Sequence, residues 1–300
     1  MKKNYKISTV MIMIMALLIS ISACSGKDDK KTAKLTYVNW EEGVAYTHLA
    51  KTILEEKMGY DVKITAADVA PAYASVAQSD QDAFMETWLP VTHEEYINKY
   101  KKDIEEIGVV VDTTKLGLVV PKYMYDAGVT KISDLLKPEV AKKIGYKITG
   151  IDAGAGVMTT TDKNIMPKYG FKQAGYKLQT SSGTAMVAAL KDAINKKKWI
   201  VVTGWQPHSM FGYFDLKFLE EDKKPKVWKH GKIYIYGKKG LKEEKPELAE
   251  FLSKMKLDDK HMSSLMVAVN ESKDINNAVK KWMKENKAVI EKWIPDSAKK

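Results

Sequence analysis

Three tryptophans occupy positions at which a chain of alternating strands and helices would place a binding site. Trp40, Trp88 and Trp205 each end an apolar run with strand character, and each is followed by a segment that turns or stops the strand. In open α/β sheets, ligands bind in the crevice beyond such strand ends. A single tryptophan of this kind is more often a core or edge aromatic. Three at equivalent positions predict one shared cleft.

An aromatic box suits a particular kind of ligand. A trimethylammonium group has a diffuse positive charge and no N–H donor, so hydrogen-bonding carboxylates gain little from it. The negative faces of indole rings attract such a group by about 0.5–2 kcal/mol per ring, depending on desolvation. The three tryptophans therefore predict a cage for a quaternary ammonium group.

A glycine-rich segment offers a place for an anionic end of the same ligand. Residues 150–158 (GIDAGAGVM) read as a strand end that passes through glycines to a helix start. Exposed backbone N–H groups and the helix dipole suit a carboxylate there, although a simple tight turn is the alternative. The segment lacks the third glycine of a dinucleotide fingerprint. His93, close after Trp88, offers a side-chain donor, or else serves as a cap or surface residue.

Enzyme motifs are not found in the sequence. The chain has five histidines but no HExxH pattern, and no serine lies in a G-x-S-x-G elbow. We therefore expect no catalytic residue, no metal site and no cofactor. Binders of choline, ectoine or an amino acid remain alternatives within the class of small-ligand proteins.

The elements that must position the tryptophans fall into two similar blocks. Strand-like runs alternate with helical stretches in each block: 35–40, 61–65 and 83–88 in the first, and 146–151, 176–180 and 199–205 in the second. Such β-α-β-α-β blocks predict two α/β lobes, each a mostly parallel sheet flanked by helices, with the ligand in the cleft between them.

The chain order gives approximate boundaries. We assign residues 34–117 to lobe 1, 118–232 to lobe 2, and 233–300 to a return crossover with C-terminal helices that pack on lobe 1. Apolar runs at 116–120 and 233–236 would carry the chain across and back. Trp282 and Trp293 are expected to be packing residues of the C-terminal part.

The N-terminus predicts export and a lipid anchor. Three lysines precede an apolar stretch of about a dozen residues, which is too short to span a bilayer but typical of a secretory signal. Small residues then lead to Cys24, as in the lipobox of bacterial lipoproteins; a free cysteine after an ordinary signal is the alternative. We expect a signal peptide at 1–23, a tether at 24–33, and a protein lipid-anchored on the extracellular face of the cell membrane. Cys24 is the single cysteine, so no internal disulfide can form.

The charge does not indicate a nucleic-acid partner. The formal net charge is +11, or +8 without the three lysines of residues 1–23, but every basic residue besides histidine is lysine. Arginine, whose planar fork suits phosphate and guanine, is absent. The lysines are also interspersed with acids, which is typical of a solvated surface.

Four motifs resemble the glycine betaine-binding proteins of ABC importers. They are Val38-Asn39-Trp40, residues 87–93 (TWLPVTH), residues 150–158, and residues 202–208 (VTGWQPH). The resemblance covers about residues 35–293 and implies a periplasmic-binding-protein-like fold. It implies an ammonium cage of Trp40, Trp88 and Trp205, with the ligand carboxylate bound by the backbone amides of Gly156 and Val157 and by His93. It also implies a permease and its ATPase as partners.

Three positions depart from the family pattern. Ser209 stands where tryptophan is often found, Tyr73 stands near a position where another aromatic is common and tryptophan is also seen, and Leu257 or a neighbour replaces a C-terminal tryptophan. None of these removes a cage residue. They leave room for a modified preference, such as proline betaine, carnitine or a sulfonium analogue.

Overall fold

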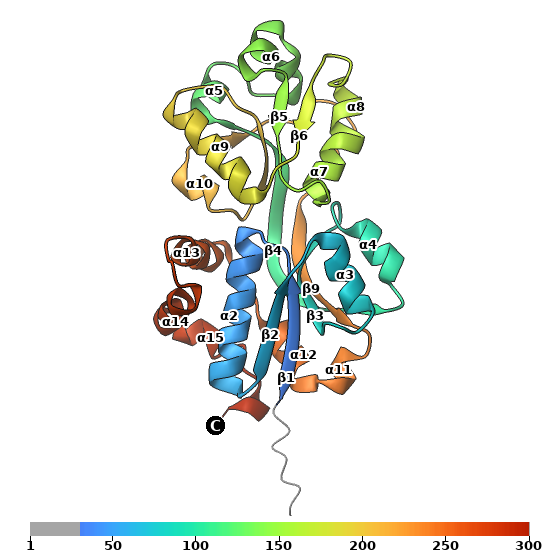
Figure 1. Ribbon diagram of the computed structural model, residues 1–300, viewed down its shortest axis with the longest axis vertical. Coiled ribbons are helices and arrows are strands. Elements are labelled where there is room, and N and C mark those ends of the chain that lie inside the picture. The colour runs from blue at the N-terminus through green and yellow to red at the C-terminus, as the bar shows by residue number, and fades with distance from the viewer. Residues whose placement is uncertain (1–30, 300) are drawn as a thin grey trace, which may run out of the picture.

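A computed structural model describes residues 31–299 of the chain. Within them the strands form one mixed sheet in the order β2-β1-β3-β9-β4-β7-β5-β6, with β8 paired to β4 (Figure 1). The strands are β1 (Thr32–Tyr37), β2 (Asp61–Ala66), β3 (Ala83–Leu89), β4 (Ile104–Pro121), β5 (Lys147–Thr149), β6 (Lys177–Gln179), β7 (Val202–Gln206), β8 (Leu216–Phe218) and β9 (Gly231–Lys238).

Helices flank the sheet in both halves of the molecule. They are α2 (Glu41–Met58), α3 (Val69–Ala77), α4 (Glu94–Tyr100), α5 (Lys122–Asp126), α6 (Pro138–Ile144), α7 (Gly156–Thr160), α8 (Met166–Tyr169), α9 (Gly183–Asn195), α10 (Met210–Tyr213), α11 (Leu241–Glu244), α12 (Pro246–Lys254), α13 (Asp259–Asn270), α14 (Ile275–Glu285) and α15 (Lys287–Ile290). Short 3-10 turns lie at Ile132–Leu136 and Asp296–Ala298, and a π turn at Thr161–Ile165. None of the helices within 31–299 is long and apolar enough to cross a membrane.

Two lobes share the sheet; the sequence predicted the two lobes, but with a mostly parallel sheet of its own in each. In the first lobe β1, β2 and β3 are parallel, and in the second lobe β5, β6 and β7 are parallel. Between these trios lie two long antiparallel strands, β4 and β9, which make the sheet mixed. β4 pairs with β9 over residues 104–114 and with β7 over residues 115–119, so it belongs to both lobes (Figure 1).

The helix between β1 and β2 shows how the local sequence determines the first lobe. Helix α2 begins after Trp40 and ends where Gly59 adopts a φ of 74°, a conformation that glycine adopts without strain. Leu49, Ile53 and Leu54 on one face of the helix are completely buried. Gly59 therefore ends the helix, and the buried face holds α2 against the first lobe.

Two sequence assignments need correction. Thr32 and Ala33, which we placed in the tether, are the first residues of β1 because they pair with Asp61 and Val62. The strand that leads into residues 116–120 begins already at Ile104, since its amino-terminal part is held by pairing with β9. The predicted signal peptide and Cys24 lie outside the described residues.

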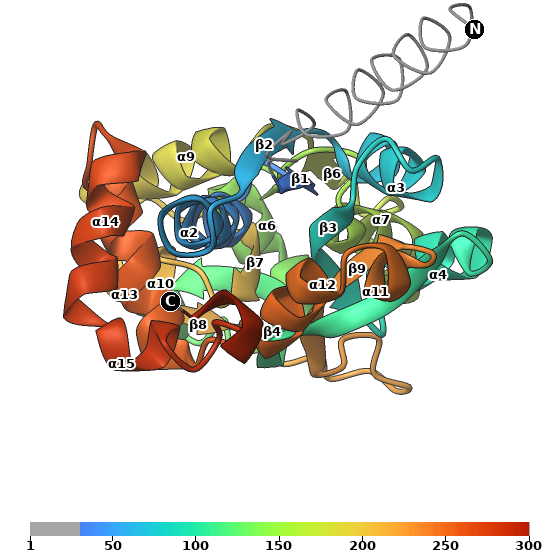
Figure 2. The same cartoon turned by 90° about the horizontal axis from the view of Figure 1, so that it is seen from below.

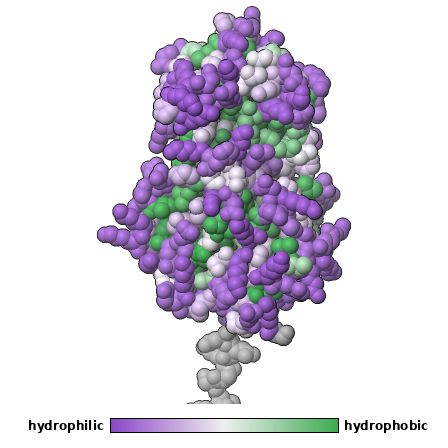
Figure 3. All heavy atoms as spheres, turned by 180° about the vertical axis from the view of Figure 1, so that it is seen from behind, coloured by the Kyte–Doolittle hydropathy of each residue, from purple (hydrophilic) through white to green (hydrophobic). Residues whose placement is uncertain are grey.

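Packing joins the C-terminal helices to the first lobe. Helices α13 and α14 contact α2, and Figure 2 shows them beside it. Trp282 and Trp293 are both buried, as predicted. The second lobe has a separate apolar cluster that includes Ile148, Phe171 and Val201. The face drawn in Figure 3 is largely hydrophilic, in agreement with a solvated, lysine-rich surface.

Candidate functional site

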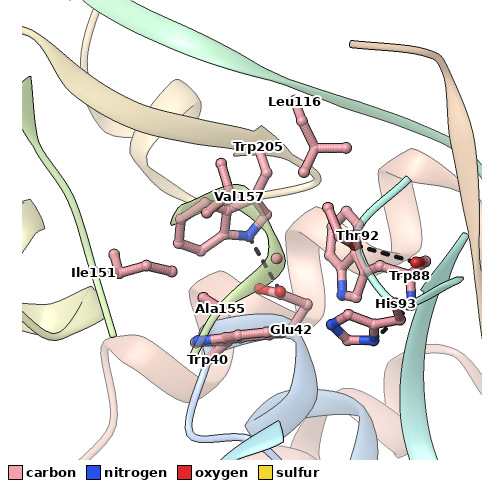
Figure 4. A pocket seen from close by; sticks show the side chains of 11 residues that line it. Trp40, Glu42, Trp88, Thr92, His93, Leu116, Ile151, Ala155, Val157 and Trp205 are labelled. Atoms are coloured by element: carbon pink, nitrogen blue, oxygen red, sulfur yellow. Dashed lines mark hydrogen bonds between the residues drawn. The ribbon is translucent and has the colours of Figure 1, made fainter. Parts of the chain in front are cut away.

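A cavity lies between the two lobes, with about 270 Å³ of space outside the protein atoms. All six residues predicted to bind the ligand line it: Trp40, Trp88, His93, Gly156, Val157 and Trp205 (Figure 4). The first three belong to the first lobe and the others to the second. Each lobe therefore supplies only part of the lining.

The three indoles come from strand ends, as expected. Trp88 and Trp205 are the second-last residues of β3 and β7, while Trp40 follows β1 and immediately precedes α2. All three side chains are buried. The ring centroids of Trp40 and Trp205 are 6.4 Å apart with an interplanar angle of 52°, so rings from the two lobes approach each other. The indole Nε1 groups of Trp40 and Trp88 have no partner among the described residues.

The loop from β3 to α4 fixes the protonation of His93. The backbone N–H of Trp88 donates to Nδ1 of His93 at 3.2 Å, which makes Nδ1 an acceptor and leaves the hydrogen of the neutral ring on Nε2. Burial lowers the pKa of His93 to about 3, so the ring is neutral at physiological pH. Nε2 is buried and has no partner within residues 31–299. His93 thus presents one free N–H donor at the cavity.

The start of α7 provides further donors. The first bonds within this helix run from the N–H groups of Met158 and Thr159 to the carbonyl of Ala155. The N–H groups of Gly156 and Val157 precede them and have no acceptor within the helix, as at any helix start. Residue 156 must be glycine, because a Cβ there would lie 2.1 Å from Cβ of Thr92. The absence of this side chain lets α7 approach the first lobe.

Glu42 lines the cavity and was not predicted. It lies in the first turn of α2, is buried, and accepts a hydrogen bond from Trp205 Nε1 at 3.1 Å (Figure 4). Its second oxygen, Oε2, has no partner among the described residues. Burial raises the pKa of Glu42 to about 8; the bonds from its own N–H and from Trp205 oppose this shift, and Glu41 adds to it.

A second buried carboxyl group lies behind Glu42. Glu86 on β3 accepts a hydrogen bond from the N–H of Val38 at 2.8 Å, and its Oε2 has no partner in the described chain. Both of its oxygens would lie 2.3 Å from a Cβ on Gly43, so this glycine allows the carboxyl group to reach the start of α2. Burial raises the pKa of Glu86 well above its usual value, and Glu42 raises it further.

Further contacts join the lobes beside the cavity. Glu41 Oε2 accepts a hydrogen bond from the N–H of Ser209 at 3.2 Å and lies 3.2 Å from Nδ1 of His208. Asn270 on α13 donates to the hydroxyl of Ser209 at 3.3 Å. The serine that departs from the family pattern is therefore part of the lobe contact and does not line the cavity.

The other departures also lie outside the cavity. The hydroxyl of Tyr73 bonds Thr87 Oγ1 at 2.8 Å and lies 3.2 Å from His93 Nδ1, so Tyr73 supports the histidine from behind. Leu257 is a buried core residue. Besides Glu42, the lining residues that sequence reasoning missed are Thr92, Leu116, Ile151 and Ala155. The last two lie within the glycine-rich motif.

Two α/β lobes that close on a small aromatic cavity define the chain as a solute-binding protein of the two-lobed type. It belongs to the family described as the substrate-binding domain of ABC-type glycine betaine transport systems, which matches residues 31–285. Members of this family serve importers on the extracytoplasmic side of the membrane.

Individual relatives agree with this assignment. The chain is 42% identical over 158 residues to the glycine betaine/carnitine transport binding protein GbuC of Listeria monocytogenes; the match covers 52% of each chain, about half the length of this relative. Lactococcal OpuAC in its closed-liganded conformation with glycine betaine is 37% identical, with a TM-score of 0.81 over 89% of this chain and 100% of that one. An ABC-transporter choline binding protein in complex with choline is 25% identical, with a TM-score of 0.79 over 87% and 91% of the two chains.

Proposed function

We propose that the protein captures glycine betaine, or a closely related quaternary-ammonium zwitterion, and delivers it to the permease of an ABC importer. The observation that supports this proposal is that indole rings and free N–H donors line the same small cavity. A zwitterion with a trimethylammonium group at one end and a carboxylate at the other matches both. We expect no catalytic step.

The ammonium end would lie among Trp40, Trp88 and Trp205. The rings are buried, so little water competes with the cation. Each ring should therefore stabilise the bound cation by an amount near the upper end of the range of about 0.5–2 kcal/mol. Because one ring comes from the second lobe, the cage is complete only when the lobes are closed.

The carboxylate end would accept hydrogen bonds from Gly156, Val157 and His93. Two of these donors are main-chain N–H groups at a helix start, which suit an anion. The third is Nε2 of His93, which is buried without a partner in the described chain. A buried donor left unpaired costs about 1–3 kcal/mol, so a ligand carboxylate here would remove an existing penalty.

Choline is the second candidate, because the carboxyl group of Glu42 lines the cavity and a relative of similar fold is named a choline binding protein. Choline shares the trimethylammonium group but ends in a neutral hydroxyl. Hydrogen bonds to a charged acceptor are worth about 1.5–3 kcal/mol, against about 0.5–1.5 for a neutral one. Glycine betaine should therefore bind at least about tenfold more tightly than choline.

Titration calorimetry with glycine betaine, proline betaine, carnitine and choline tests this function. We expect selective binding of the zwitterions. Equal affinity for betaine and choline would refute the carboxylate site, even with the cage intact. A protein that binds none of the four would refute the proposed function.

We also propose that the protein is anchored through a lipid on Cys24, after removal of a signal peptide at 1–23. The lipobox-like sequence before the cysteine supports this. Cys24→Ala should release the protein from the membrane and leave ligand affinity unchanged. Retention of the variant in membranes after salt and alkaline washes would contradict the anchor.

A further inference from the structure

The strongest unexplained feature of the cavity is the free carboxyl oxygen of Glu42. A buried polar atom without a hydrogen bond is costly. Trp205 satisfies Oε1, but Oε2 has no partner within residues 31–299 and the side chain lines the cavity. In Figure 4 this carboxyl group points into the space between Trp40 and Trp205.

A carboxylate can attract a trimethylammonium group even though that group has no N–H donor. A hydrogen bond is impossible, but the Coulomb attraction between unlike charges grows several-fold in a site that excludes water. The group that would profit most from a cation is a buried acid whose charge nothing else would compensate. Glu42 fits this description, since within residues 31–299 its side-chain hydrogen bond is to a neutral indole and the neighbouring charge that shifts its pKa is the acid Glu41.

We propose that Glu42 is an additional ligand-binding residue, whose free oxygen faces the ammonium group and which releases a proton when the ligand enters. This inference rests on the proposed function. Glu42 would become negatively charged only when the ligand binds. The ligand affinity would therefore depend on pH.

The groups around Glu42 determine the direction of this coupling. Glu41, adjacent in the chain, disfavours a charge on Glu42, whereas Glu86, behind the start of α2, has its own pKa raised by burial and by Glu42. Across the cavity His93 is neutral, and burial lowers the pKa of His208, the ring beside Glu41. Among the described residues, these histidines therefore provide no positive charge to compensate Glu42. A quaternary ammonium group would lower its pKa and displace the proton to solvent.

The measurement is calorimetry of betaine binding to the whole mature protein at pH 7 in two buffers that differ in ionisation enthalpy, phosphate and Tris. We expect proton release for the wild type. The betaine affinity should rise between pH 6 and pH 8, by at most about tenfold per pH unit for one released proton. Choline should release protons as well, because the effect depends on the ammonium group and not on the carboxylate at His93.

Two variants and a control assign the proton. Glu42→Gln keeps an oxygen for the Trp205 bond but cannot ionise, so betaine should still bind, without proton release and with an affinity independent of pH over this range. Glu86→Gln removes the neighbouring acid, whose own pKa Glu42 raises further, so proton release at pH 7 should persist if Glu42 is its source. Glu139→Gln, at an exposed acid in the first turn of α6, is the matched control and should behave as the wild type.

The outcomes separate the two proposals. Betaine binding with the same enthalpy in both buffers would overturn the role of Glu42 and leave the proposed function intact. Proton release that persists in Glu42→Gln would also overturn it. Failure of betaine and choline to bind at all would refute the proposed function, and this inference with it.

Discussion

Removal of the His93 donor gives the most direct test of the carboxylate site. His93→Ala deletes the Nε2 hydrogen that has no partner in the described chain, and also leaves the N–H of Trp88 without its acceptor. A hydrogen bond from this donor to a charged carboxylate is worth about 1.5–3 kcal/mol, or about 10- to 150-fold in affinity. For choline, whose hydroxyl is neutral, the loss should be only about 2- to 10-fold. The variant should therefore narrow the preference for betaine over choline.

Two further measurements make this prediction specific. His93→Gln retains an N–H donor near the Nε2 position and should recover part of the betaine affinity, whereas His230→Ala, at an exposed histidine, should change neither affinity. Since the pKa of His93 is about 3, its own titration should not affect betaine binding between pH 5 and pH 8. The assay is a pair of dissociation constants for each variant at one pH and salt concentration. Equal losses for betaine and choline in His93→Ala would refute the reasoning.

Three other predictions follow from the same geometry. Trp88→Ala should weaken betaine binding by about 1–3 kcal/mol, roughly 5- to 150-fold, while Trp293→Ala should lower the melting temperature more than the affinity. Gly156→Ala should weaken betaine binding at least about tenfold, because a Cβ would lie 2.1 Å from a side-chain atom of the first lobe; Gly154→Ala, with no atom within 4 Å, is the control and should bind normally. In the empty protein, Glu42 keeps its proton up to a pH of about 8, whereas the unfolded chain loses it near 4.5. The contribution of Glu42 to the free energy of unfolding should therefore fall as the pH rises through this range, by at most about 1.4 kcal/mol per pH unit, and Glu42→Gln should abolish this fall in denaturant titrations.

The parts of the site that the sequence could predict are those whose signal is local. A tryptophan at a strand end and glycines before a helix are visible in a few consecutive residues, and the structure brings Trp40, Trp88, Trp205 and the amides near Gly156 to one cavity. Glu42 gave no such signal. An acid in the first turn of a helix is usually a favourable, solvated partner of the helix dipole. Its hydrogen-bond partner Trp205 is 163 residues away in the chain, so the local sequence gives no sign of the contact.

The same distinction applies to the fold. The alternation of strands and helices in each lobe follows from local apolar patterns and stop residues such as Gly59. The amino-terminal part of β4 was missed because residues 104–109 (IEEIGV) combine acids and a glycine, and their strand conformation depends on pairing with β9. Thr32 and Ala33 were assigned to the tether for the same reason, since only their pairing with β2 makes them part of a strand.

In the proposed function, the first turn of α2 would link ligand capture to closure of the lobes. Trp40 would supply a ring of the cage, Glu41 accepts a hydrogen bond from the N–H of Ser209, and Glu42 accepts one from Trp205. Hydrogen bonds of this kind contribute about 0.5–3 kcal/mol each, and the Glu41 side chain is partly exposed, so these contacts alone hold the lobes together only weakly. A ligand that bridges cage and amides adds attraction that exists only in the closed form. The equilibrium between open and closed lobes shifts by as much as the ligand's affinity differs between these two states. Closure that depends on the ligand in this way would also permit release in the proposed function, because a permease that separates the lobes would remove Trp205 and both amides from the ligand at once.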